Sequence, residues 1–195
     1  MIRLAPVGRF LLGAVISLSL PPYGMWALAP IGLGIFLRTS RSLSRRRRLF
    51  DAWSLWMGYY AVALTWMIDL TVPGWVIATP VQALIMALPM AFIPANGIGR
   101  SISVPSALVL GEALRWVVPF GGVPMSNLAL GPVDTYLVDV VRVGGALLLI
   151  ASIGIIAVGV EGALSAQLRT TLGPLAAIVL LDRKSTRLTP VTSLS

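Results

Sequence analysis

Apolar stretches separated by short polar segments dominate the pattern of this 195-residue chain. A helix that crosses a membrane needs about 20 predominantly apolar residues for a hydrocarbon core of about 30 Å. Stretches of this length, or shorter ones that can pair as the arms of a hairpin, lie at residues 10–20, 25–37, 49–70, 76–93, 105–118 and 137–164. A further stretch begins at residue 172 and ends at residue 181. The pattern predicts an all-α, polytopic transmembrane helix bundle with about six to seven spans.

The first two apolar stretches are short, and Pro21-Pro22-Tyr23-Gly24 separates them. Two prolines break a helix and glycine allows the chain to turn, so this segment predicts a short helical hairpin. Tyr23 and Trp26 are expected at the membrane interface, where aromatic side chains are enriched. A basic start before a short apolar stretch is also typical of a signal peptide. The second apolar stretch and the missing small-x-small cleavage site favour the hairpin.

The charge balance supports a membrane protein. Only 11% of the residues are charged and 57% are hydrophobic, whereas about 25% charged residues are typical of a soluble domain. A strongly positive net charge, here +8, is also typical of nucleic-acid-binding proteins. In this chain, however, arginines concentrate in one loop, which begins at Arg38 and ends at Arg48. Basic loops between spans face the cytoplasm. We therefore predict a multi-pass protein with a cytoplasmic N-terminus and loop, and no nucleic-acid partner.

The sequence offers little catalytic chemistry of its own. It contains no cysteine and no histidine, which excludes thiol nucleophiles, disulfides, zinc-thiolate sites and imidazole bases within these residues. Its seven acidic residues are scattered, and no phosphate loop or dinucleotide motif is present. We predict no catalytic residue, no metal site and no cofactor in this sequence.

Polar residues at membrane depth are the informative ones, because charge is costly to bury there. Glu112 and Arg115 are three residues apart and so share one face of a helix. They either hold helices together or face a cavity for lipid head groups. Glu161 is expected at the cytoplasmic rim. The Gly- and Pro-rich residues 119–125 predict a stiff turn that packs on protein or lines a cavity.

Three segments resemble motifs of the bacterial apolipoprotein N-acyltransferases. Residues 112–115 (EALR) with 118–124 (VPFGGVP), residues 20–26 (LPPYGMW) and residues 58–66 (GYYAVALTW) have that family's order and spacing, followed by Gly131-Pro132. The resemblance covers about residues 5 to 180. Met125 departs from it, because the family usually has a tryptophan there.

The resemblance implies a fold and a reaction. In the family, seven spans lead into a nitrilase-like domain with a glutamate base, a lysine and a cysteine nucleophile, none of which can be assigned in this chain. The implied enzyme of the bacterial inner membrane takes an acyl chain from a phospholipid as a cysteine thioester. It passes the chain to the α-amine of a diacylglyceryl-lipoprotein. Surrounding membrane lipids are the other implied partners. This chain alone is expected to be inactive.

By position, the resemblance assigns a set of residues to a rim that contacts lipid substrates: Glu112, Arg115, Phe120, Gly121, Gly122, Pro124 and Trp66. Residues 1–181 are the expected transmembrane domain with a shortened last span, and the basic, Ser/Thr-rich residues 182–195 form a non-native or disordered tail. Two other functions remain open: a small transporter or permease subunit, for which Gln82, Glu112 and Arg115 offer a thin polar path, and a membrane assembly module.

Overall fold

The computed structural model describes residues 5–118, 122, 126–133 and 135–185, with side chains up to residue 166. All regular elements in these ranges are helical, which confirms the predicted all-α class. The α-helices are α1 (Pro6–Ser17), α2 (Leu28–Ser40), α3 (Arg45–Ala63), α4 (Val72–Met90), α5 (Ile98–Arg115) and α6 (Val141–Ser185). Short 3₁₀ helices are η1 (Thr65–Asp69), η2 (Leu128–Leu130) and η3 (Tyr136–Val140).

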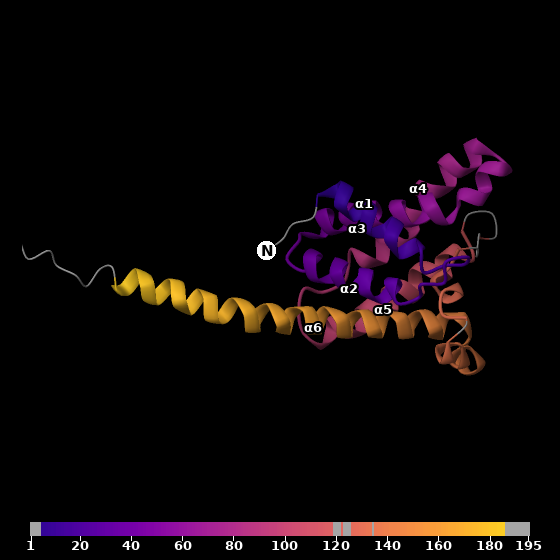
Figure 1. Ribbon diagram of the computed structural model, residues 1–195. Coiled ribbons are helices and arrows are strands. Elements are labelled where there is room, and N and C mark those ends of the chain that lie inside the picture. The colour runs from indigo at the N-terminus through magenta and orange to yellow at the C-terminus, as the bar shows by residue number, and fades with distance from the viewer. Residues whose placement is uncertain (1–4, 119–121, 123–125, 134, 186–195) are drawn as a thin grey trace, which may run out of the picture. The chain divides into compact units, whose positions relative to one another are not determined.

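The chain divides into two compact units, residues 1–161 and residues 162–195. The first unit contains α1 to α5 and the beginning of α6, and Figure 1 shows its helices running back and forth between two ends. The second unit contains the remainder of α6. The apolar stretches at residues 137–164 and 172–181 were predicted as separate spans, whereas the helix assignment of α6 covers Val141 to Ser185, with a kink of non-helical backbone at Gly144 and Gly145.

Two glycines bring α1 and α3 into close contact. A Cβ atom added at Gly13 would overlap the backbone carbonyl of Leu55, and one at Gly58 would overlap the carbonyl of Phe10. Small residues of this kind allow the backbones of membrane helices to approach closely. α1 also packs on α2, as expected for the predicted hairpin, while α3 packs on α4 and α4 on α5.

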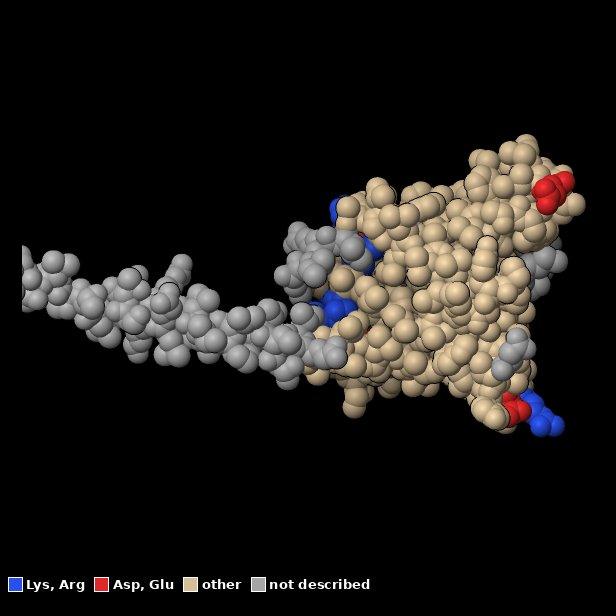
Figure 2. All heavy atoms as spheres, viewed as in Figure 1, with Lys and Arg blue, Asp and Glu red and all other residues tan. Residues whose placement is uncertain are grey.

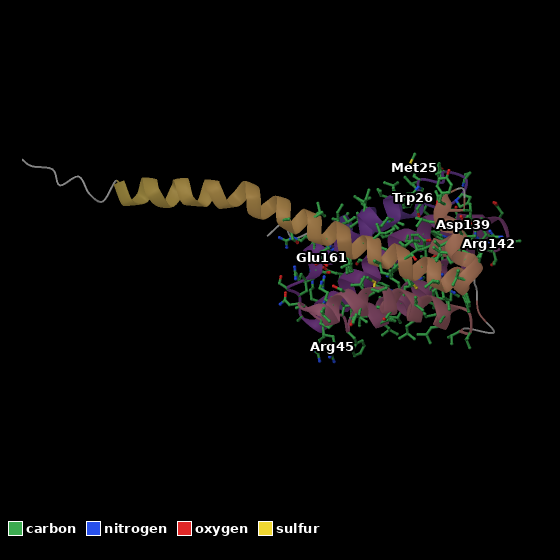
Figure 3. All side chains as sticks on the ribbon, turned by 90° about the horizontal axis from the view of Figure 1, so that it is seen from below. Met25, Trp26, Arg45, Asp139, Arg142 and Glu161 are labelled. Carbon is green, nitrogen blue, oxygen red and sulfur yellow. The ribbon has the colours of Figure 1, made fainter. Side chains whose placement is uncertain are left out.

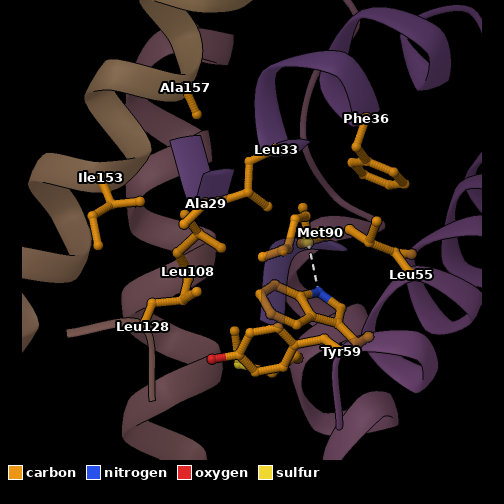
Figure 4. Packing of buried hydrophobic residues seen from close by; sticks show 14 of the residues in the cluster. Ala29, Leu33, Phe36, Leu55, Tyr59, Met90, Leu108, Leu128, Ile153 and Ala157 are labelled. Carbon is orange, nitrogen blue, oxygen red and sulfur yellow. Dashed lines mark hydrogen bonds between the residues drawn. The ribbon is translucent and has the colours of Figure 1, made fainter. Parts of the chain in front are cut away.

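A continuous apolar core joins these helices (Figure 4). Trp56 of α3 is fully buried in it, and its indole Nε1 donates a hydrogen bond to the sulfur of Met90 at 3.1 Å. Leu33 of α2 and Ile153 of α6 are buried in the same cluster. Because lipid tails are as apolar as these side chains, close van der Waals packing within this core, rather than transfer out of water, holds the helices of residues 5–161 together.

Helix length sets which elements can cross a membrane. Among the described residues, α4 and the segment Tyr136–Ala166 are long and apolar enough to do so, while α1 and α2 have only 12 and 13 residues. The count of six to seven spans therefore stays a prediction. On the face shown in Figure 2, the described surface is largely uncharged, and its charged side chains gather at opposite ends.

The two ends carry the residues that the sequence assigns to opposite sides. Arg45 and Glu161 lie at one end of the helices, which we call the arginine-rich end (Figure 3). Trp26, Asp139 and Arg142 lie at the other, which we call the loop end. This separation agrees with the charge asymmetry that predicts the topology.

The segment from Arg38 to Arg48, predicted as a loop, is mostly helical. α2 continues to Ser40, and α3 begins at Arg45, with the Ser44 side chain accepting a hydrogen bond from the Arg47 backbone N–H. Arginine is a good helix former and a serine N-cap stabilises a helix start, so the basic residues extend α2 and α3 and leave only residues 41–44 between the two helices.

Buried arginines tie the arginine-rich end together. Arg100 of α5 forms a two-pronged contact with the Glu161 carboxylate, at 3.0–3.2 Å, and also donates to the backbone carbonyl of Leu37 at 2.8 Å. Arg48 donates to the carbonyl of Ile93. Burial lowers the pKa of Arg48, and the neighbouring guanidinium charges lower it further. Glu161, which was expected at the cytoplasmic rim, is buried at the arginine-rich end, where Arg100 compensates its charge.

Candidate lipid-binding site

Two of the three segments that carry the family resemblance, residues 20–26 and 58–66, line one cavity at the loop end, together with residues that follow the third segment. We call it the loop-end cavity; its volume is about 370 Å³. The hairpin turn, the end of α3 with η1, and the segment before η2 supply its walls. The lining residues are Ser17, Leu20, Pro21, Pro22, Tyr23, Val62, Ala63, Thr65, Trp66, Ser126 and Leu130.

Hydrogen bonds to Ser126 fix one wall of the loop-end cavity. The Tyr59 hydroxyl donates to the backbone carbonyl of Ser126 at 2.9 Å, and the Ser126 hydroxyl donates to the carbonyl of Ala63 at 2.8 Å. Gly131 packs directly against the carbonyl of Ser19, so the segment around η2 also approaches the hairpin closely. α1, α3 and the loop therefore hold the cavity from three directions.

The cavity combines apolar walls with a few hydroxyl groups. Trp66 is 38% exposed, and Tyr23 is also exposed at the cavity, so both present aromatic surface to whatever enters it. The lining side chains that can donate hydrogen bonds are those of serine, threonine, tyrosine and tryptophan. Among the described lining residues there is no carboxylate, lysine or arginine, and their mixture of apolar and hydroxyl groups is suited to binding an amphipathic molecule.

A buried polar network stands behind this wall. Arg115 is 0% exposed, its Nη1 donates to both carboxylate oxygens of Glu112 at 2.8 Å, and its Nε donates to Gln82 Oε1 at 2.6 Å. Its guanidinium also lies over the Tyr60 ring, 4.6 Å from the centroid. We call these four residues the Arg115 network. The network joins α3, α4 and α5. Tyr60 lies close to the end of α3 that lines the cavity.

The structure places the predicted rim residues in different surroundings. Trp66 lines the loop-end cavity. Glu112 and Arg115 pair with each other in the helix interior and do not line it, so the interpretation that they hold helices together fits their burial. Phe120, Gly121 and Pro124 lie outside the described residues.

Gly122 occupies a position that favours glycine. Its φ is 93°, a left-handed conformation, and a Cβ atom there would overlap the carbonyl of Trp116. Other side chains disfavour this conformation, so glycine allows the chain to turn back on the end of α5. Gly122 thus shapes the loop without lining the cavity.

Sequence reasoning missed Ser126, Tyr59 and Tyr60 as site residues. Both tyrosines stand in the segment 58–66 that carries the resemblance, which is the signal that could have identified them. Ser126 has no such signal, because its role depends on contacts with residues more than sixty positions earlier in the chain. Among the described residues, no three histidine, cysteine, aspartate or glutamate side chains lie together as metal ligands.

Comparison with known proteins shows which proteins this chain resembles. A family model described as the apolipoprotein N-acyltransferase N-terminal domain matches residues 12–159. A curated relative from Shewanella oneidensis, named apolipoprotein N-acyltransferase, is 36% identical over 58 residues. That alignment covers 30% of this chain and 11% of the relative, so the chain matches only a small part of the relative's length.

Proposed function

Because the chain belongs to the apolipoprotein N-acyltransferase family through its N-terminal domain, we propose that it forms the membrane part of such an enzyme. In this proposal the chain lies in the bacterial inner membrane as a bundle of about six to seven spans. Its arginine-rich end faces the cytoplasm and its loop end faces outward. The reaction of the whole enzyme is the transfer of an acyl chain from a phospholipid to the N-terminal amine of a diacylglyceryl-lipoprotein.

The observation that supports this role is that two of the three family-like segments line the loop-end cavity, together with residues that follow the third. Segments 20–26 and 58–66 both contribute lining residues, and the segment that follows 112–124 supplies Ser126 and Leu130. Family motifs that lie far apart in the sequence are most simply explained when their residues build a common site. An aromatic and hydroxyl-lined cavity at the end of apolar helices suits the glycerol and upper acyl region of a lipid.

The membrane part contributes binding and orientation in this proposal, and no covalent step. The acyl–enzyme thioester of the family needs a cysteine thiolate, and none of the 195 residues is cysteine. We therefore expect the chain alone to acquire no acyl group from a phospholipid. The loop-end cavity would hold a lipid substrate close to the catalytic domain that carries the nucleophile, which converts a diffusional encounter into a positioned one.

A chimera tests the role in acyl transfer. Residues 1–166 replace the corresponding membrane part of the Shewanella oneidensis enzyme, and acylation of a lipoprotein N-terminus is measured in membrane vesicles. We expect the chimera to transfer the acyl chain and Trp66→Ala to lower kcat/KM roughly tenfold, since most of an aromatic contact with the lipid is lost.

Ile77→Ala is the matched control, because Ile77 is an exposed apolar residue of α4 that does not line the cavity. The 195-residue chain by itself serves as the second control and should give no product. An unchanged kcat/KM in the Trp66→Ala chimera, or acyl transfer by the chain alone, would contradict the proposed role.

A further inference from the structure

A second polar cavity lies at the arginine-rich end, away from the loop-end cavity. We call it the arginine-end cavity; its volume is about 310 Å³. The inner ends of α1 and α2, the turn between α2 and α3, and the first turns of α3 form its walls. Its lining residues are Arg9, Thr39, Ser42, Leu43, Ser44, Arg47 and Asp51, and Leu43 alone among them is apolar.

We propose that the arginine-end cavity binds the singly charged phosphate group of an anionic phospholipid from the adjacent leaflet. The proposal concerns a site distinct from the loop-end cavity. It uses the topology proposed above only to say which leaflet supplies the lipid.

Arg9 provides a fixed cationic wall. It is 1% exposed, its Nε lies 3.3 Å from Asp51 Oδ2, and its Nη1 donates to the Thr39 hydroxyl. Its guanidinium also stacks on Phe36, 5.2 Å from the ring centroid. A guanidinium held in this way on three sides is preorganised, so little side-chain freedom is lost when an anion binds to it.

Arg47 provides a second, adjustable cation from a different helix. Its Nε lies 3.1 Å from Asp51 Oδ1, while 52% of its side chain is exposed and can close over a ligand. The cavity thus contains two guanidinium groups and one carboxylate, which leaves one positive charge in excess. A phosphodiester whose head group carries no compensating cation, as in phosphatidylglycerol, brings one net negative charge and matches that excess.

The remaining lining favours the same ligand. Ser44 caps the N-terminus of the 19-residue helix α3, whose dipole places partial positive charge at this wall. Arg41, Arg45 and Arg46 are neighbouring arginines outside the cavity that raise the local concentration of anionic head groups. The end of an apolar bundle lies where lipid phosphates are most concentrated, which favours a lipid over free phosphate as the source.

Lipid retention by the full 195-residue chain tests the proposal. The chain is equilibrated in micelles with equal amounts of phosphatidylglycerol and phosphatidylcholine, and bound lipids are identified by native mass spectrometry. We expect retention of phosphatidylglycerol in preference to phosphatidylcholine, and a roughly tenfold weaker preference in Arg47→Ala, because a charge-assisted contact is lost.

Arg46→Ala is the matched control, since it removes the same charge from the neighbouring position without touching the cavity wall. It should keep the preference within about twofold, as expected for an exposed charge. Arg9→Lys keeps the charge but loses the forked geometry, and it should weaken retention to an intermediate extent. Unfolding temperatures of all variants separate loss of binding from loss of fold.

Inorganic phosphate, added to micelles of phosphatidylcholine alone, identifies the source of the ligand. Binding of inorganic phosphate that Arg47→Ala weakens supports the anion site and assigns it to free phosphate. If Arg46→Ala and Arg47→Ala weakened the preference for phosphatidylglycerol equally, general surface charge would explain the effect and the proposal would be overturned. The absence of any preference for phosphatidylglycerol in the unchanged chain would also overturn it.

Discussion

Gly58→Ala is expected to lower the free energy of unfolding by about 3 kcal/mol or more, the upper range for overpacking a tight interface. The added methyl group would meet the backbone carbonyl of Phe10, which cannot rotate away as a side chain can. α1 and α3 would have to separate, and with them the α1 and α3 walls of the loop-end cavity. The measurement is the thermal unfolding midpoint of the chain in detergent micelles.

Gly159→Ala is the control for this substitution. Gly159 is a helical residue of α6 with no atom near the position of an added Cβ. Alanine favours the helix over glycine by about 1 kcal/mol, so the control should be neutral or slightly more stable. If Gly58→Ala unfolds at the same temperature as the unchanged chain, the close crossing of α1 and α3 is wrong.

Glu112→Ala is expected to destabilise the chain by about 3–5 kcal/mol, the range for breaking a buried ion pair. The Arg115 guanidinium would remain fully buried with Gln82 and Tyr60 but without its counter-charge. Glu112→Gln keeps a hydrogen-bond acceptor and should therefore lose less stability than Glu112→Ala. Chemical unfolding followed by tryptophan fluorescence measures these differences.

A double substitution separates charge from packing. Glu112→Leu combined with Arg115→Met removes both charges and keeps apolar volume, so it should be more stable than Glu112→Ala. Asp139→Ala removes the same type of charge from an exposed site in η3 and should change stability little. Equal losses for Glu112→Ala and Asp139→Ala would contradict the burial of the Arg115 network.

Much of the fold follows from local patterns. The proline pair at residues 21 and 22 predicted the hairpin, and apolar runs predicted the helices, because both depend on nearby residues. Helix α5 was predicted to begin at residue 105 and instead begins at Ile98, with Pro105 inside it. A proline removes one backbone donor, and its effect on a helix depends on whether neighbours compensate, which the local sequence does not reveal.

The site could be predicted only in part for the same reason. The spacing of Glu112 and Arg115 already placed them on one helical face, and they do pair. Gln82 joins them from α4, 33 positions away, and Tyr60 joins from α3, so these contacts depend on how the helices pack. The loop-end cavity likewise exists only once the hairpin, the end of α3 and the segment around η2 have come together.

Mapping a photoreactive phospholipid onto the chain tests the central claim most directly. The lipid carries a diazirine near its glycerol, the chain is held in lipid nanodiscs, and labelled peptides are identified by mass spectrometry. The account predicts that peptides containing Tyr23 and Trp66 are labelled several-fold more than the exposed surface of α4 around Val76 and Ile77. Equal labelling of these peptides and of the α4 surface would show that the loop-end cavity does not bind lipid.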